Sequence, residues 1–333
     1  MTTRKPSALV LFSGGLDSIL VVKLLREQGI PVQAVFFSCP FYSSECAIKS
    51  ARALRLRIHE VPVDSSYFRM VKNPPHGYGA NMNPCIDCKV YMLRRAEKLR
   101  KSMGLDFLAT GEVVGERPLS QTRHALMQIE KLSSLSGKIL RPLSGGILPS
   151  TFPEIRGLVK RKKLLSIHGR SRKPQLALAM KYRVKEFPAP AGGCLLTDPE
   201  YSGRLKEHLR YNSVISWDIA ELLKYGRQFR FKKTKIIVGR NETDNNSILR
   251  VAKRLRLPRL EVLGHPGPLT IIASKRPTQK SIEAAASLTV RYSDAPVKPL
   301  VSVELIQGKS RRLLDARAIP RRDLERMRIQ AST

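Results

Sequence analysis

Six residues near the start of the chain, SGGLDS at Ser13–Ser18, have the composition of a phosphate-binding turn. Gly14 and Gly15 let the backbone turn tightly, and the free N–H groups of a following helix can then bind a phosphate or pyrophosphate. Ser13 and Ser18 add hydroxyl donors, while the carboxylate of Asp17 suits a Mg²⁺ ion or a contact at a helix start. The segment therefore predicts a site for a phosphorylated ligand with Mg²⁺; an ordinary strand-to-helix turn is the alternative.

A second pattern, Cys85-Ile86-Asp87-Cys88, stands where a helix is expected to begin. A helix dipole favours the thiolate, so both thiols are expected to have lowered pKa values and to bind a metal or carry sulfur. Asp87 is a candidate general base or substrate-orienting residue, with helix capping as the alternative. Cys39 and Cys46 lie on an apolar strand and a helix, and are interpreted as small buried hydrophobic residues.

Apolar runs and helical spacing alternate through the first 110 residues. Strands are expected at 8–12, 32–38, 57–63 and 107–110, with helices at 18–26, 45–54 and 85–103. This alternation predicts an α/β fold, a parallel doubly wound sheet with helices on both faces, whose ligands bind at the carboxyl ends of the strands. Residues 73–84, rich in Pro, Gly and Asn, are expected to form a loop.

The length of 333 residues suits two domains, which we place at 1–224 and 225–333. The first includes a basic segment at 151–183, expected to be helical. The second changes to a smaller α+β pattern. Its expected elements are strands at 232–240, 260–263 and 269–273 and a helix at 281–292.

The charge balance is strongly basic: 60 Lys and Arg against 27 Asp and Glu give a formal net charge of +33. Such an excess indicates a polyanionic partner, most simply a nucleic acid, because each Lys or Arg that meets a phosphate releases a condensed counterion. No apolar run approaches 18 residues and the run at 8–12 is too short for a signal peptide. We therefore expect a cytoplasmic protein without a membrane partner, and five reduced cysteines rather than a disulfide framework.

SGGLDS after an apolar strand resembles the signature of the PP-loop ATP pyrophosphatases, whose fold is adenine nucleotide alpha hydrolase-like. The resemblance implies that ATP is cleaved between its α and β phosphates and that AMP is transferred to a carbonyl oxygen of the substrate. Its nucleotide-site residues would be Ser13, Gly14, Gly15, Asp17 and Ser18. The segment ATGEVVGERPLSQ at 109–121 is similar to the family's second nucleotide segment, which implies that Gly111 lies near the nucleotide.

NPCIDCK around Cys85 and Cys88 resembles the NPCxxC segment of tRNA 2-thiouridylases and related tRNA thiolation enzymes, in which a third cysteine follows, here Cys194. The resemblance implies tRNA as substrate. In one mechanism the three cysteines hold a [4Fe-4S] cluster whose open iron binds sulfide. In the other, which needs no metal, a cysteine persulfide carries the sulfur and another cysteine, Cys85 or Cys194, resolves it. We favour the cluster; a zinc site with His76 or His168 as fourth ligand is a further alternative.

Three C-terminal segments, 236–249, 263–272 and 283–295, resemble the RNA-binding module of the NFACT family. The resemblance implies a small α/β unit that binds RNA, and the basic residues at 227–233 and in the arginine-rich tail fit phosphate contact. Besides tRNA, the expected partners are a sulfur donor, either sulfide or a persulfide carrier, and a second copy of the chain in a homodimer. Two alternatives are an adenylating enzyme that uses an amine or ammonia, and an NFACT-like RNA-binding adaptor without ATP turnover.

Overall fold

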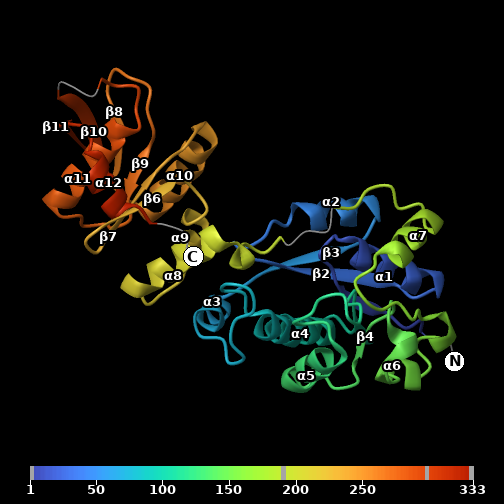
Figure 1. Cartoon of the computed structure of the whole chain (residues 1–333). Coiled ribbons are helices and arrows are strands. Elements are labelled where there is room, and N and C mark those ends of the chain that lie inside the picture. Colours follow the sequence, from blue (N-terminus) through green and yellow to red (C-terminus); the bar gives the residue numbers. More distant parts are fainter. Residues whose placement is uncertain (1–3, 189–192, 297–299, 330–333) are drawn as a thin grey trace. The chain divides into compact units, whose positions relative to one another are not determined.

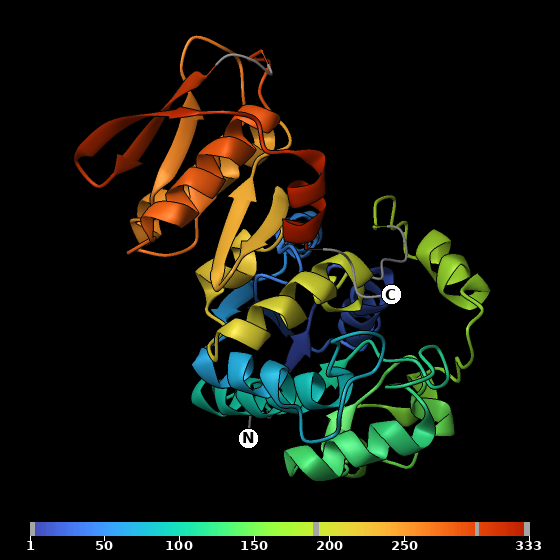
Figure 2. The same cartoon turned by 60° about the vertical axis from the view of Figure 1, so that its left-hand side comes forward.

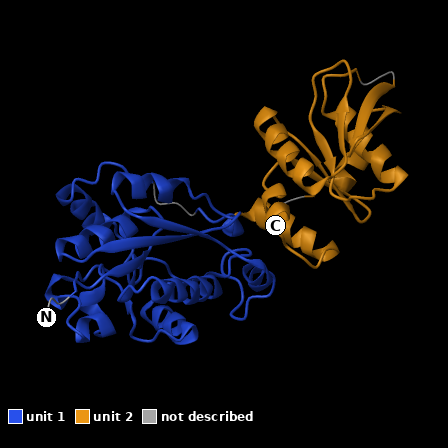
Figure 3. Cartoon of the chain, turned by 180° about the vertical axis from the view of Figure 1, so that it is seen from behind, with its two compact units in different colours: residues 1–197 blue, residues 198–333 orange. Residues whose placement is uncertain are grey.

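The computed structural model describes residues 4–188, 193–296 and 300–329 of the chain. The chain forms two compact units, Met1–Thr197 and Asp198–Thr333 (Figure 3). Among the described residues, none of the helices has the length and apolar character needed to cross a membrane.

The first unit is built on a five-stranded sheet with the order β3-β2-β1-β4-β5, in which each neighbouring pair is parallel. Its strands are β1 (Ala8–Leu11), β2 (Val32–Ser38), β3 (Ile58–Pro62), β4 (Phe107–Thr110) and β5 (Ile139–Leu140). The predicted parallel sheet is confirmed. Successive strands are added on one side of β1 up to β3 and then on its other side from β4, so the strand order reverses at β1. Ligands bind at such a reversal point in open α/β sheets.

Helices cover both faces of this sheet, with α1, α2 and α7 on one side and α4 and α5 on the other (Figure 1). The helices are α1 (Leu16–Glu27), α2 (Glu45–Ala53), α3 (Ser65–Lys72), α4 (Cys85–Ser102), α5 (Arg123–Ser133), α6 (Phe152–Ile155) and α7 (Lys173–Lys181). The doubly wound arrangement agrees with the sequence prediction.

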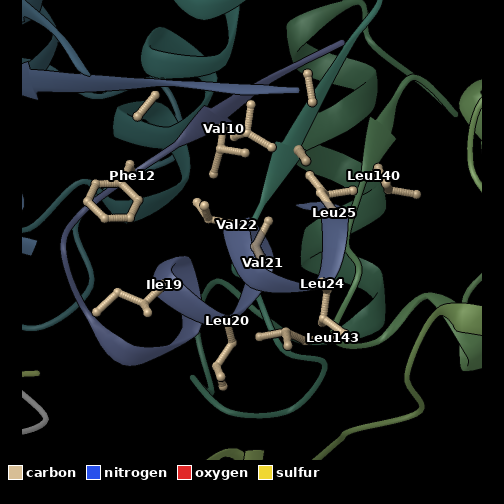
Figure 4. Close-up of a cluster of buried hydrophobic side chains, with 14 of the residues drawn as sticks. Val10, Phe12, Ile19, Leu20, Val21, Val22, Leu24, Leu25, Leu140 and Leu143 are labelled. Carbon is tan, nitrogen blue, oxygen red and sulfur yellow. The ribbon is translucent and has the colours of Figure 1, made fainter. Parts of the chain in front are cut away.

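The core of the first unit lies between the sheet and α1 (Figure 4). Val10 and Phe12 from the first strand and its end meet Ile19 and Val22 of α1, and all four side chains are buried. The helix is apolar on nearly all sides because the sheet covers one face and α7 packs against another. This burial fixes the start of α1 relative to β1.

The basic segment at 151–183 differs from the predicted helix. Only α6, α7 and a short 3-10 turn at Arg161–Lys163 are helical. Gly157 and Gly169 have φ values of +66° and +82° and end the local turns. Both dihedrals lie in the left-handed region that glycine tolerates and a helix interior does not allow.

The second unit contains a six-stranded antiparallel sheet with the order β11-β10-β8-β9-β7-β6. Its strands are β6 (Arg227–Phe231), β7 (Thr234–Val238), β8 (Arg259–Val262), β9 (Thr270–Ile272), β10 (Val301–Gln307) and β11 (Ser310–Ala316). Its helices are α8 (Pro199–Tyr211), α9 (Trp217–Leu222), α10 (Glu242–Leu255), α11 (Gln279–Arg291) and α12 (Arg321–Met327). Figure 2 shows α11 lying along the sheet, and the α+β prediction is confirmed.

The second unit begins at Asp198, before the predicted boundary at 224/225. The reason is that α8 packs on the antiparallel sheet. Arg204 donates to the carbonyl oxygens of Leu223 and Gly226, at 3.0 and 3.2 Å, and Glu207 pairs with Lys235 of β7 at 2.8 Å. These buried polar contacts join α8 to the strands.

Candidate functional site

The loops that follow β1 and β4 meet at the reversal point of the parallel sheet. Leu11 is in register with Thr110, so the next residues of both strands lie side by side. A Cβ atom added to Gly111 would lie 2.9 Å from the carbonyl carbon of Asp17 and from the nitrogen of Ser18. Gly111 therefore allows the second loop to contact the backbone of the first.

The turn at Ser13–Ser18 is held in place by its own hydroxyls and by α2. Gly14 has a φ of +77°, and an added Cβ would lie 2.6 Å from the Cα of Ala47 in α2. Ser50 of α2 donates to the carbonyl oxygen of Gly14 at 2.9 Å, and Ser18 donates to that of Gly15 at 2.8 Å. The turn is thus preorganised. The N-terminus of α1 lies at the carboxyl ends of the parallel strands, and a helix N-terminus binds anions favourably.

Asp17 lies in the first turn of α1, and its Oδ1 atom is buried without a hydrogen-bond partner among the described residues. Burial raises the pKa of Asp17, against the opposing charge of Arg172. The pKa of Glu116 is also raised, first by burial and then by the charge of Asp17. Because Mg²⁺ is usually held by one or two carboxylates together with substrate phosphates, these two carboxylates fit the magnesium ion of Mg-ATP.

A buried ion network supports the second loop from behind. Glu112, next to Gly111, pairs with Lys89 of α4 and accepts from Arg141 at 3.0 Å; Arg141 also pairs with Glu130. Burial acts to raise the pKa of Glu112, but the charges of Lys89 and Arg141 outweigh it and hold the pKa at about 2. The network fixes α4, which carries Cys85 and Cys88, against the strand that carries Gly111.

The three candidate sulfur-site cysteines gather in the first unit. Cys85 is the first residue of α4 and Cys88 lies one turn later. Cys194 is brought in by two backbone bonds of the following residues: the N–H of Leu195 donates to Phe41 at 2.9 Å, and the carbonyl of Leu196 accepts from Met82 at 3.0 Å.

The thiols do not have the lowered pKa values predicted from the helix start. Burial raises the pKa of Cys85 and raises the pKa of Cys88 and of Cys194 to about 12. After burial, the charges of Cys194 and Cys85 also contribute to raising the pKa of Cys88. Desolvation outweighs the helix dipole here, because a buried thiolate loses more hydration than the dipole returns.

The candidate cysteine and histidine side chains are not arranged as the ligands of an iron–sulfur cluster or a zinc ion. Cys85 donates to Asn83 Oδ1 at 3.1 Å, and Cys88 shares a hydrogen bond of 3.3 Å with the Tyr67 hydroxyl. Within the described ranges, no three His, Cys, Asp or Glu side chains are grouped to hold a metal ion. His76 is bound to Asp87, and His168 contacts the Ser166 carbonyl. The geometry thus favours neither the predicted cluster nor the zinc alternative.

Asp87 does not cap α4, in contrast to one of the predicted roles. Its carboxylate accepts from the backbone N–H of His76 at 3.0 Å and pairs with Nδ1 of the same histidine at 2.7 Å. The side chain is buried, and the cap position is occupied by Pro84 without a side-chain bond. Asp87 therefore anchors the loop at 73–84 over the start of α4.

The two remaining cysteines differ from each other. Cys39 is buried, as predicted, but it also acts electrostatically on the thiol of Cys194, whose pKa it helps to raise after burial. Cys46 is exposed on α2, so its prediction as a buried residue is wrong. The sequence did not predict that Cys39 acts on Cys194, because the two residues lie far apart in the chain.

Several residues that sequence reasoning missed lie at this site, namely Lys89, Glu112, Glu116, Arg117, Arg172 and Gln175. Arg117 is the most informative, because its charge acts to lower the pKa of Asp17, of Cys85 and of Cys194 in opposition to burial. One guanidinium thus lies within electrostatic range of both the phosphate-binding turn and the thiols. From the sequence, the segment at 109–121 predicts only Gly111 as a nucleotide-site residue.

The arginines predicted for RNA contact are mostly engaged within the second unit. Arg227 stacks over Tyr292 at 4.5 Å, Arg230 pairs with Glu207, and Arg311 pairs with Glu304 at 3.0 Å. Lys232 and Lys233, in the turn between β6 and β7, are exposed. These lysines remain available for phosphate contact.

Comparison with known families assigns both ends of the chain. Residues 4–146 match the family described as thiamine biosynthesis protein (ThiI), and residues 226–328 match the NFACT protein RNA binding domain. The chain joins a ThiI-type segment to an NFACT-type segment. The resemblance of the C-terminal segments to the NFACT family is thereby confirmed.

Curated relatives of the ThiI-type segment are described as probable tRNA sulfurtransferases. The one from Thermoanaerobacter sp. (strain X514) is 31% identical over 147 residues, 41% of this chain and 37% of that protein. The one from Anoxybacillus flavithermus (strain DSM 21510 / WK1) is 30% identical over 145 residues, 41% of this chain and 34% of that protein. The chain therefore spans about a third of the length of the curated relatives it matches.

Two solved structures are similar only at a low level. A 4-thiouridine synthetase–RNA complex with bound ATP has a TM-score of 0.36 and 22% identity, covering 54% of this chain and 52% of that chain. The C-terminal part of a fibronectin/fibrinogen-binding protein from Streptococcus suis has a TM-score of 0.28 and 14% identity, covering 73% and 94%. The strand order β3-β2-β1-β4-β5 shows the doubly wound fold of the first unit independently of these similarities.

Proposed function

We propose that this protein is a tRNA sulfurtransferase that uses ATP to adenylate a carbonyl oxygen of a tRNA base and then replaces that oxygen with sulfur. The observation that carries the proposal is the geometry that joins the two motifs. Gly111 approaches the backbone of Asp17 and Ser18 closely, and its neighbour Glu112 pairs with Lys89, the residue after Cys88. Activation and sulfur transfer would then occur at one site. The match of residues 4–146 to ThiI supports the same reaction.

In the first step the base carbonyl oxygen attacks the α-phosphorus of ATP. An O–P bond forms, the bond from the α-phosphorus to the bridging oxygen breaks, and pyrophosphate leaves with that oxygen and its electron pair. The N-terminal N–H groups of α1 and the Mg²⁺ ion near Asp17 would stabilise the negative charge that develops on the phosphates. The nucleotide-site roles of Ser13, Gly14 and Gly15 are part of this proposal.

In the second step the terminal sulfur of a cysteine persulfide attacks the activated carbon, and AMP leaves with the oxygen. A second cysteine then attacks the Sγ atom of the cysteine that carried the persulfide. The bond from this Sγ to the transferred sulfur breaks, the thiocarbonyl base is released, and a disulfide joins the two cysteines. We assign these two roles to Cys85 and Cys194. A persulfide-bearing donor supplies the sulfane sulfur, and a dithiol reduces the disulfide before the next turnover, so that electrons and sulfur balance.

Support for tRNA as the substrate comes from the net charge of +33 and from the match of residues 226–328 to an RNA-binding domain. A cytoplasmic setting follows from such a substrate. Because polycation–phosphate contact releases counterions, the affinity for tRNA should fall steeply with salt. A homodimer remains a prediction, which sedimentation analysis of the free protein and of its tRNA complex can check.

The test is anaerobic incubation of the protein with an unmodified tRNA transcript, Mg-ATP and a persulfide source, followed by mass spectrometry of the nucleosides. We expect one oxygen-to-sulfur exchange that requires ATP and is lost in Asp17→Asn, Cys85→Ala and Cys194→Ala. The exposed cysteine gives the matched control, Cys46→Ala, which should keep full activity. The mass of the product and its fragmentation identify the thiolated base.

Three other outcomes of this experiment would change the proposed function. If tRNA stimulates pyrophosphate release but no thionucleoside forms with either a persulfide source or sulfide, the nucleophile is an amine and the sulfur proposal is refuted. If the protein binds tRNA but releases no pyrophosphate, it is an RNA-binding adaptor. Thiolation from inorganic sulfide that needs iron reconstitution, with all three cysteines required, would replace the persulfide route by the cluster route.

A further inference from the structure

Unpartnered polar atoms gather where the start of α7 meets the phosphate-binding turn. Gln175 is fully buried, and neither atom of its amide completes a hydrogen bond of ordinary geometry among the described residues, although the amide lies close enough to lower the pKa of Asp17. Within the same ranges, Oδ1 of Asp17 and Nε of Arg172 are also buried without partners. A buried polar group without a partner costs about 1–3 kcal/mol, so such a group usually has a ligand, ion or water to bind.

The backbone explains why these atoms lie together. The N–H of Gly169 donates to the carbonyl of Val114 at 2.7 Å, and Val114 forms a parallel bridge with His168. The segment leading into α7 therefore runs alongside the loop that carries Glu116 and Arg117, and α7 itself packs against α1. This contact places the first turn of α7 beside the loop that follows β1.

The charges at this contact are complementary to a magnesium–phosphate group. Arg172 stands at the N-cap position of α7 and Asp17 lies in the first turn of α1, and these two helices pack against each other. Two carboxylates provide the oxygen ligands that Mg²⁺ prefers, and a guanidinium binds phosphate through two parallel N–H bonds. A neutral amide beside the carboxylates can orient one of them without adding charge.

We propose that α7 completes the ATP site: Arg172 binds the β and γ phosphates, and the Gln175 amide positions Asp17 toward the magnesium ion. The proposal rests on the proposed function, because it names the part of the protein that recognises the leaving pyrophosphate. Neither residue lies in the 4–146 segment that matches ThiI. The sequence predicts only a basic helical segment at 151–183, whereas in the structure Arg172 lies within electrostatic range of Asp17 and Glu116.

The test measures ligand binding by the full-length protein without tRNA, so it does not depend on sulfur transfer. Isothermal titration with α,β-methylene-ATP plus Mg²⁺, and separately with AMP, compares wild type with Arg172→Ala, Arg172→Lys and Gln175→Leu. The control is Arg170→Ala, since Arg170 is exposed in the same segment. Thermal unfolding of each variant reports its folded fraction.

For Arg172→Ala we expect roughly 10-fold or greater loss of affinity for the ATP analogue, the size of a charge-assisted hydrogen bond, with unchanged affinity for AMP. Arg172→Lys should recover part of the loss, and Arg170→Ala should bind as wild type. Gln175→Leu should raise the Mg²⁺ concentration needed for half-maximal binding of the analogue.

Equal weakening toward the ATP analogue and AMP, or wild-type affinity in Arg172→Ala, would overturn the role of Arg172 in phosphate binding. An unchanged Mg²⁺ requirement in Gln175→Leu would overturn the positioning role. Absence of any ATP binding by the wild type would refute this inference together with the adenylation step. Binding that is intact in Arg172→Ala while thiolation proceeds normally would refute only this inference.

Discussion

Replacement of Gly111 by alanine tests whether the loops after β1 and β4 form a nucleotide site. The new methyl group would lie 2.9 Å from the carbonyl carbon of Asp17 and the nitrogen of Ser18, whereas ordinary contacts begin near 3.4 Å. Both neighbours are backbone atoms at the start of α1, so no side chain can rotate away. The phosphate-binding turn must therefore move by roughly half an ångström, at a cost of about 1–3 kcal/mol in stability.

The functional consequence follows from how steeply catalysis depends on position. A displacement of 1 Å costs on the order of 100-fold in rate, so about half that displacement should lower tRNA-dependent pyrophosphate release by roughly 10-fold. ATP affinity should fall as well, although no side chain that contacts ATP has been removed. Both quantities are measured on the purified variant at saturating tRNA, with thermal unfolding followed in parallel.

A matched control separates displacement of the turn from general destabilisation. Gly104 has a φ of +63° and no atom within 4 Å of an added Cβ. Gly104→Ala should therefore cost about 1–2 kcal/mol through backbone strain alone, with ATP affinity and pyrophosphate release unchanged. If Gly111→Ala keeps wild-type ATP affinity and rate, or if the two variants lose activity equally, the close approach of the loops does not determine nucleotide binding.

Three further predictions follow from the first unit. The pKa of Glu112 is about 2 in the folded state, against an ordinary value of 4.5, so its ionised form stabilises the fold above about pH 4.5 and this contribution is lost as the pH falls toward 2. Glu112→Gln should therefore lower the free energy of unfolding in urea by up to about 3 kcal/mol at pH 7 and by much less near pH 3. An equal loss at both pH values would contradict this. Peptide mapping after alkylation at pH 7.5 should show that the exposed Cys46 is labelled first. Cys194, whose pKa is about 12, should be labelled about a thousandfold more slowly than an ordinary thiol. Similar labelling rates for Cys46 and Cys194 would show instead that both are accessible thiolates. Asp87→Asn should weaken the anchor of the loop at 73–84, so limited proteolysis should cut there earlier than in wild type while the circular dichroism spectrum is retained, and an unchanged cleavage pattern would argue against anchoring.

The local order of the first unit could be predicted because it depends on neighbours in the chain. An apolar run followed by SGGLDS predicted β1, its turn and α1, and the strands at 32–38 and 107–110 were predicted with the bounds that the structure shows. The helix that begins at Cys85 was likewise predicted, since a loop rich in Pro and Gly precedes it. Periodicity and turn chemistry suffice for such elements.

Features that depend on packing could not be predicted from local sequence patterns. The sequence predicted lowered thiol pKa values from the helix dipole alone, while the structure raises them because burial removes water from the sulfurs. The second unit begins at Asp198, before the predicted boundary, because Glu207 of α8 pairs with Lys235 of the sheet, and these residues are distant in the chain.

The sequence by itself determined which residues can bind phosphate and which can carry sulfur. Only the tertiary structure decided that the segments carrying these two sets meet, through Gly111 and the Glu112–Lys89 pair, and that the start of α7 packs beside Asp17. The physical reason is that side-chain chemistry and local backbone preference are properties of short segments. Burial, the field of neighbouring charges and the hydrogen-bond partners of an atom depend instead on segments that meet only when the chain folds.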